Sequence, residues 1–224
     1  MFIGHFAVGL AAKRVLPAVS LGTLFLAVQF ADLRWPTFVL LGLESFTNQP
    51  GITVVTPLDF VNYPYSHSLV MSAVWAIVFG ATYWGINRNM KCTVVILSVL
   101  VLSHWLLNFV THRPDMPLTI SGEQVVGLGL WNSLPGTMIV EITMFIIGIG
   151  LYLKSTQSLD KVGKFSFWTL VTFLLVIYLG NLFGPLPPST NAVTWSAQSI
   201  WLLVVWGYWI DRHRISKIKE VGDN

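Results

Sequence analysis

The sequence predicts an all-α fold, a polytopic membrane helix bundle with about six long spanning helices and a short N-terminal helix. Of the 224 residues, 54% are hydrophobic and 10% are charged, and the mean hydropathy is +0.68. A soluble domain of this size could not hide so much apolar surface. Apolar runs of roughly 20 residues, the length that crosses a hydrocarbon core of about 30 Å, recur along the chain.

The predicted helices follow in chain order. An apolar stretch over 2–15 is shorter than a normal span, and its positive charges follow the apolar part, whereas a secretory signal carries them in front. We therefore expect it to be retained. The long spans are expected over 18–43, 67–86, 92–110, 138–153, 165–184 and 194–210, the fourth being short for a full crossing. Together they form a single membrane domain over residues 1–224.

The basic residues predict the orientation. Eleven of the 13 Lys and Arg residues fall in alternate connections and in the C-terminal tail: Lys13, Arg14, Arg88, Lys91, Lys154, Lys161, Lys164, Arg212, Arg214, Lys217 and Lys219. The positive-inside rule makes these segments and the C-terminus cytoplasmic and places the loops at 44–66, 111–137 and 185–193 outside. The net charge of +3 is thereby explained by topology, so membrane lipids and no nucleic acid are the expected partners.

The ionisable residues inside the predicted spans gather at one depth. At about 1.5 Å of rise per residue, His5, Asp32, His104 and Glu141 lie roughly 15–21 Å above the cytoplasmic ends of their helices. Such groups are costly in lipid unless they face a cavity, a partner or an ion. We therefore predict one shared polar site in the outer half. Its further members on the same side are Asn108, one turn above His104, then His67, and the turn with His112, Arg113 and Asp115.

Each of these residues also has a structural explanation. His104 and Asn108 share a helix face and could hydrogen-bond a neighbouring helix, and Asp32 could pair with Arg34. His67 could bond to the loop before it. Glu141 could accept from backbone or Trp N–H groups. The loop carboxylates Glu44, Asp59 and Glu123 are expected to be solvated.

Several of these residues stand in motifs that resemble a known family. The motifs are GHFAVG (4–9), Asp32 in the second helix, PYSHSL (64–69), SHWLLNFVTHRPDMPL (103–118) and GLGLWNSLPGTMIVE (127–141). Over residues 1–153 the chain resembles the YdjM-like family of bacterial inner-membrane proteins, described as metal-dependent hydrolases. Residues 154–224, two additional C-terminal helices and the basic tail, add nothing specific to the resemblance.

The resemblance implies a bacterial inner-membrane protein with a divalent-metal site, distantly similar to zinc-dependent phospholipase C enzymes. The family's His-x-x-x-Asp reads His104 to Asn108 here, and its Pro-Asp-x-Asp reads Ala31-Asp32-Leu33-Arg34. Two carboxylate positions are thus absent, which argues against a site with several metal ions.

The residues themselves suggest the chemistry. The sole cysteine, Cys92, excludes thiolate clusters, so a metal must be held by other side chains. The imidazoles of His5, His67 and His104, with Asp32 or Glu141, suit zinc and leave room for water. Asn108 and His112 are further candidate ligands. Glu141 or Asp115 is expected to serve as general base, and Arg113 to hold a phosphate.

These observations predict hydrolysis of an ester or phosphoester, and the depth of the site suggests a lipid at the outer face of the membrane. Two other functions stay open. The protein could be an ion- or proton-coupled transporter that relays protons through Asp32, His104 and Glu141. It could also be a non-catalytic scaffold whose polar cluster locks helices together. A visible inverted repeat would favour transport, and the sequence contains none.

Overall fold

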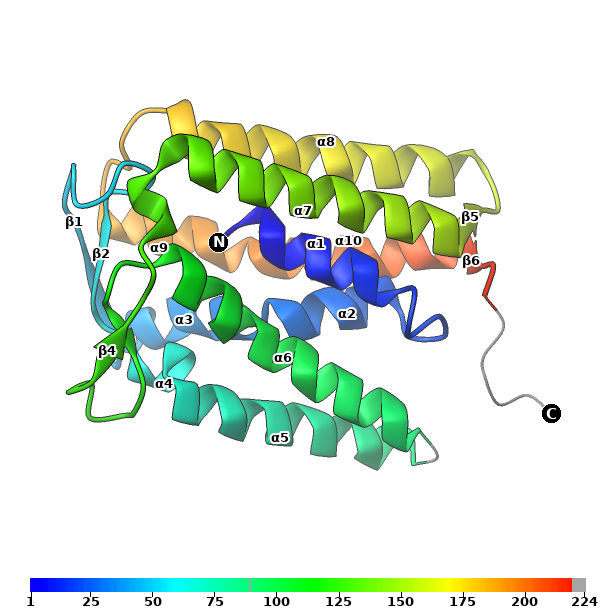
Figure 1. The fold of residues 1–224 in the computed structure, drawn as a ribbon. Coiled ribbons are helices and arrows are strands. Elements are labelled where there is room, and N and C mark those ends of the chain that lie inside the picture. The colour runs from blue at the N-terminus through cyan, green and yellow to red at the C-terminus, as the bar shows by residue number, and fades with distance from the viewer. Residues whose placement is uncertain (89, 219–224) are drawn as a thin grey trace.

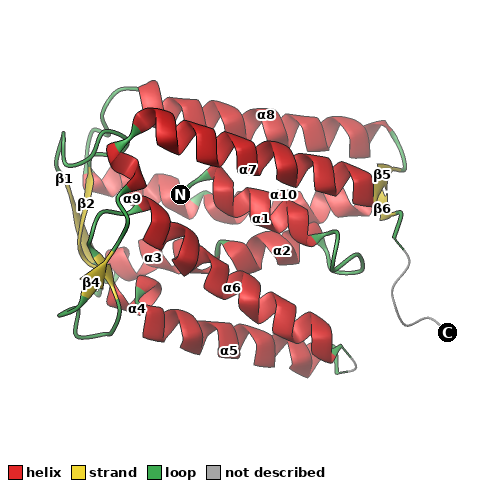
Figure 2. Ribbon diagram, in the orientation of Figure 1, coloured by secondary structure: helices red, strands yellow, loops and turns green. Residues whose placement is uncertain are grey.

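The computed structural model describes residues 1–88 and 90–218 of the chain, and Lys219 of the predicted basic tail lies outside them. The described part is a bundle of helices with short two-stranded sheets at its ends (Figures 1 and 2). Four of its helices are long and apolar enough to cross a membrane: α5 (Leu69–Ile86), α6 (Lys91–Thr111), α7 (Leu134–Ser155) and α8 (Lys161–Phe183). The predicted class, a membrane helix bundle, is confirmed to that extent.

The other two predicted spans are each divided into two helices. The span expected over 18–43 consists of α2 (Leu21–Val28) and α3 (Phe30–Leu40), and that over 194–210 of α9 (Thr190–Gln198) and α10 (Ile200–Arg212). The first break is at Gln29 and the second at Ser199, where the Ser196 and Ser199 hydroxyls bond to backbone carbonyls. With about 1.5 Å of rise per residue, none of these four helices alone spans a core of about 30 Å.

The short N-terminal helix α1 (Ile3–Ala12) occupies the middle of the bundle, beside α7 and α2 (Figure 1). Its backbone touches that of α7, because a Cβ placed at Gly148 would lie 2.5 Å from the carbonyl oxygen of Ala7. Small residues permit such close approach between membrane helices. Phe6 of α1 packs edge-to-face on Phe25 of α2 in the main core. The apolar residues of α1 thus face protein, which explains how so short a helix is accommodated.

The end of the bundle that contains Lys13 and Arg214 is held together by these two buried cations. Lys13, just after α1, donates to both carboxylate oxygens of Asp211 on α10, at 3.2 and 3.0 Å, and to the carbonyl oxygen of Val19 at 2.8 Å. Arg214 donates to Thr156, Ser158 and the carbonyl of Gly163. It thereby joins α8 to the antiparallel strands β5 (Thr156–Ser158) and β6 (Arg214–Ser216).

The predicted outer loops are folded over the opposite end of the helices. They contain α4 (Pro64–His67), η1 (Leu130–Asn132), and the antiparallel pairs β1 (Ser45–Asn48) with β2 (Leu58–Asn62) and β3 (Met116–Pro117) with β4 (Val125–Val126). Beneath them lies a separate apolar cluster around Trp35, Phe46, Tyr63, Trp105 and Met116. This cap holds α4 and the start of α3 against α6, and these three elements carry the polar site.

Candidate functional site

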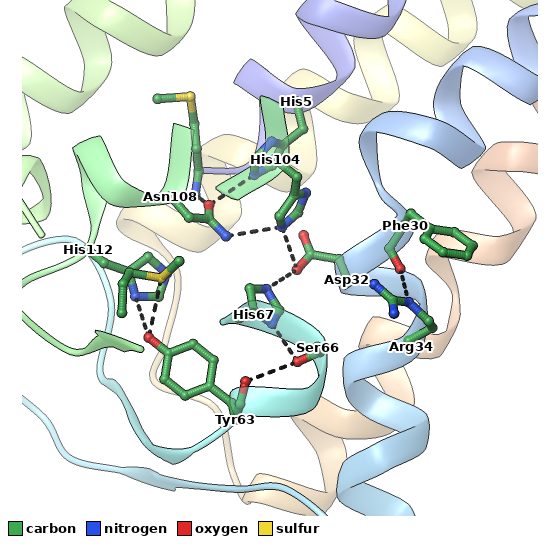
Figure 3. A network of polar contacts seen from close by, with 12 residues as sticks. His5, Phe30, Asp32, Arg34, Tyr63, Ser66, His67, His104, Asn108 and His112 are labelled. Carbon is green, nitrogen blue, oxygen red and sulfur yellow. Dashed lines mark hydrogen bonds and ion pairs between the residues drawn. The ribbon is translucent and has the colours of Figure 1, made fainter. Parts of the chain in front are cut away.

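The polar site is centred on Asp32, in the first turn of α3 (Figure 3). Its Oδ1 lies 3.3 Å from Nε2 of His67 on α4 and 3.4 Å from Nε2 of His104 on α6. Both imidazoles are buried, whereas 26% of the Asp32 side chain is exposed. Three elements far apart in the sequence thus bring an acid and two histidines to one point.

The orientation of His104 is fixed by its other ring nitrogen. Nδ1 lies 2.8 Å from the carbonyl oxygen of Val28, which can only accept, so Nδ1 carries the hydrogen. Nε2 accepts from the side-chain amide of Asn108 at 3.0 Å. The lone pair of Nε2 is therefore engaged by the Asn108 amide, although Nε2 also lies beside Asp32, and a metal ion bound to Nε2 would replace this hydrogen bond.

His67 is held in the same way by a relay of side chains. Its Nδ1 lies 2.6 Å from the Ser66 hydroxyl, which donates to Glu44 Oε2 at 2.7 Å. Since the hydroxyl proton goes to the Glu44 carboxylate, the Ser66 oxygen accepts from Nδ1–H of His67. The lone pair of His67 is therefore on Nε2, which faces Asp32. Burial lowers the pKa of His67 to about 4, against the opposing effect of Asp32, so the ring is neutral at neutral pH.

Glu44 was missed as a site residue by the sequence reasoning, which expected it to be solvated. It is buried, and it accepts from both the backbone N–H and the hydroxyl of Ser66. Burial raises the pKa of Glu44, and the hydrogen bonds from Ser66 oppose that rise. No pattern joins two residues 22 positions apart, although the two serines around His67 did indicate an orienting partner for its ring.

His5 completes the cluster from α1. Its ring stacks on that of His104, with centroids 3.8 Å apart and planes at 7°, and its Nε2 lies 3.0 Å from Asn108 Oδ1. Its Nδ1 is buried without a hydrogen-bond partner. One ligand atom each from His5, Asp32 and His104 lie within 4.8 Å of one another.

These residues fit a divalent metal ion. Two ligands bound at about 2.1 Å to a tetrahedral ion stand about 3.4 Å apart, which matches the separations between Asp32 and the two histidines. The lone pair of His67 Nε2 and the Asp32 carboxylate, which face each other, also repel unless a cation or a proton lies between them. Asp32 and His104 would hold the ion, with His5 or His67 as a third ligand.

Two predicted alternatives can now be compared with the contacts. Arg34 does not pair with Asp32, because its guanidinium donates to the carbonyl of Phe30 and lies over the rings of Phe30 and Trp75 (Figure 3). Glu141 does bond backbone, since its Oε2 accepts from the N–H groups of Phe2 and Gly4 at 2.9 and 3.2 Å. Glu141 therefore caps the start of α1 in addition to facing the site.

The predicted residues His112, Arg113 and Asp115 form a second network nearer the outer surface. Nδ1 of His112 lies 3.0 Å from Asp115 Oδ1, and Arg113 bonds to the other oxygen of Asp115 and to Asp59. The Tyr63 ring contacts both His67 and His112 and separates the two clusters. Burial lowers the pKa of His112, while Asp115 opposes this. Asp59 is thus ion-paired, in contrast to the expected solvation.

A cavity of about 1050 Å³ opens beside the first cluster. Its polar end is lined by Asp32, His67, Asn108 and Glu141, and the rest by the β1–β2 connection and by α8, α9 and α10. The cavity therefore brings Asp32 and Glu141 to a common space that a ligand could enter. His112, Arg113 and Asp115 are absent from its lining as described.

The comparisons with known proteins identify no relative: no protein-family model, curated protein or solved structure matches the chain.

Proposed function

We propose that this protein is a membrane-embedded, metal-dependent hydrolase that acts on an ester or phosphoester at the outer face of the membrane. The observation that carries the proposal is the approach of two oriented imidazoles to one carboxylate. His67 and His104 are each fixed through Nδ1 by an acceptor, Ser66 and the Val28 carbonyl, so that both Nε2 atoms face Asp32. Zinc suits this set of nitrogen and oxygen ligands, and the single cysteine offers no competing thiolate cluster.

A zinc ion bound here would acidify a water molecule and polarise the ester oxygen. The protein itself supplies a general base and a cavity for the substrate. Glu141 lines the cavity, and the carboxylate oxygen that does not serve Phe2 and Gly4 can take the proton from the attacking water. The water oxygen bonds to the carbonyl carbon or phosphorus, and the bond to the leaving oxygen breaks. Asp115 is directed to His112 and Arg113, so Glu141 is the preferred base of the two predicted.

The second candidate is a non-catalytic scaffold in which the polar cluster holds the helices together. The contacts of Asp32 with His67 and His104 would favour it if a proton took the place of the metal. A protonated His104 would pair with Asp32 as an ordinary buried ion pair across α6 and α3. A transport function has less support. Among the described residues, the buried cations at the other end of the bundle, Lys13 and Arg214, already bind Asp211 and the carbonyl of Gly163.

The deciding experiment measures bound metal. We expect near-stoichiometric zinc in the purified native protein, none in His104→Ala, and partial retention in Asn108→Ala. His104 contributes a ligand atom, whereas loss of an orienting partner such as Asn108 weakens binding by roughly 10- to 100-fold. Zinc is counted per protein after purification without added metal and again after zinc loading. If all three proteins bind no divalent metal under either condition, the hydrolase proposal fails and helix locking explains the cluster.

The orientation proposed with this function has the site outside, the C-terminus in the cytoplasm and the chain in a bacterial inner membrane, with α2–α3 and α9–α10 as two broken crossings. In a Cys92→Ser background, a cysteine replacing Asn191 in α9 should react with an impermeant maleimide from outside, and one replacing Leu159 should not. Both positions are exposed. Cell lysis, which admits the reagent to both faces, is the control for Leu159. Reversed labelling would move the site to the cytoplasmic face.

A further inference from the structure

The cavity beside the polar cluster is strongly divided in its chemistry. At one end lie Asp32, His67, Asn108 and Glu141. Most of the remaining lining is apolar and includes Phe173 and Ile177 of α8 and Ile200 and Leu203 of α10, with Asn181 and Ser196 among the polar exceptions. At about 1050 Å³ it is as large as the largest sites that bind small soluble ligands. A ligand that fills it must be polar at one end and apolar over most of its length.

The apolar wall belongs to a helix whose other side chains face away from the cavity. Phe173 and Ile177 of α8 line the cavity, whereas Val176 on the same helix is 59% exposed and does not line it. Because α8 is long and apolar enough to span the membrane, a ligand that entered past it would stay in apolar surroundings.

We propose that this cavity binds one phospholipid of the outer leaflet, with its acyl chain between α8 and the α9–α10 pair and its headgroup toward Asp32 and His67. This deepens the proposed function by naming the substrate class of that site. It also gives a role to residues 154–224, which supply the helices that line the acyl-chain part of the cavity. Binding itself does not depend on metal or on hydrolysis.

Photolabelling in the metal-free variant His104→Ala tests the proposal. The protein is reconstituted in vesicles of phosphatidylethanolamine and phosphatidylglycerol that contain a phosphatidylethanolamine with a diazirine near the end of its acyl chain. After irradiation, the labelled residues are mapped by mass spectrometry. We expect several-fold more label on residues 173–182 and 192–203 than on 70–78 of α5, which also carries exposed apolar side chains but does not line the cavity. Equal label on the three segments would overturn the proposal.

A matched pair of variants locates the ligand. Gly180 lines the cavity and Gly150 on α7 does not, and a Cβ at either position meets nothing within 4 Å. Gly180→Phe should remove the excess label and Gly150→Phe should keep it, with label on α5 unchanged in both as evidence of normal insertion.

The result is separable from the test of the metal site. Excess label at α8 and α9–α10 in a protein that binds no zinc would support the lipid cavity and defeat the hydrolase. Zinc binding with label spread evenly over the lipid-facing helices would retain the metal site and defeat the lipid cavity. Excess label that survives Gly180→Phe unchanged would place the lipid outside this cavity and overturn the proposal.

Discussion

Asp32→Ala is expected to abolish zinc binding and, with it, hydrolysis of bis(p-nitrophenyl) phosphate and of p-nitrophenyl esters. Asp32 supplies the one carboxylate oxygen that faces His67 and His104, at 3.3 and 3.4 Å. Its removal takes a negative charge and a ligand from the ion, so the loss should exceed the roughly 10- to 100-fold that follows from losing an orienting partner. Zinc affinity is measured by competition with a chromophoric chelator, and hydrolysis by release of nitrophenol.

The matched control for this variant is Asp160→Ala. Asp160 also contacts a histidine, with Oδ2 2.7 Å from Nδ1 of His213, but its side chain is 46% exposed and lies at the start of α8, outside the candidate site. A backbone hydrogen bond from Gly163, with the contact to His213, holds the pKa of Asp160 below its usual range. We expect Asp160→Ala to bind zinc like the native protein. Native zinc affinity in Asp32→Ala would show that the metal site is built from other residues.

Lys13→Met is expected to destabilise the protein by about 3–5 kcal/mol, the usual result of removing one partner of a buried ion pair. The Lys13 and Asp211 side chains are 5% and 17% exposed, and Lys13 also bonds to the Val19 carbonyl. For a chain of this length, such a loss corresponds to a fall in Tm of roughly 6–20 °C. Intrinsic fluorescence during heating in detergent gives the Tm.

Arg14→Met is the control for Lys13→Met, because Arg14 is the adjacent basic residue and is exposed. It should leave the Tm within a degree or two of the native value, as surface changes of less than about 0.5 kcal/mol do. The double variant Lys13→Met with Asp211→Leu should recover much of the loss, since no uncompensated charge is left. If Lys13→Met alone unfolds at the native temperature, the ion pair does not hold α1 against α10.

The composition and spacing of the sequence were enough to predict a membrane helix bundle. In lipid, long apolar runs such as those of α5 and α6 can satisfy the hydrogen bonds of their backbone N–H and C=O groups only as helices. The depth of His5, Asp32 and His104 could be estimated as well, because rise per residue is constant along a helix. The structure brings these three residues together, with Asn108 and His67 beside them.

Other features of the site could not be predicted, because they depend on how helices rotate and tilt against each other. Depth alone could not separate His112 from His67, and it is the Tyr63 ring that lies between them. Nor could it show that Glu141 would meet the backbone of α1 or that Glu44 would fold back onto Ser66. The breaks at Gln29 and Ser199 are likewise invisible to hydropathy, which averages over a window longer than either half-helix.

The sequence by itself indicated that this protein folds in a membrane, because its composition is strongly apolar. It also allowed the depth of the ionisable residues to be estimated, because the rise per residue of a helix is fixed. The tertiary structure alone decided which nitrogen of His67 and of His104 faces Asp32, through Ser66 and the Val28 carbonyl. It also decided that α8, α9 and α10 enclose a cavity against Asp32 and Tyr178. Hydrogen-bond direction and enclosed volume arise only when separate helices pack, and no local pattern encodes them.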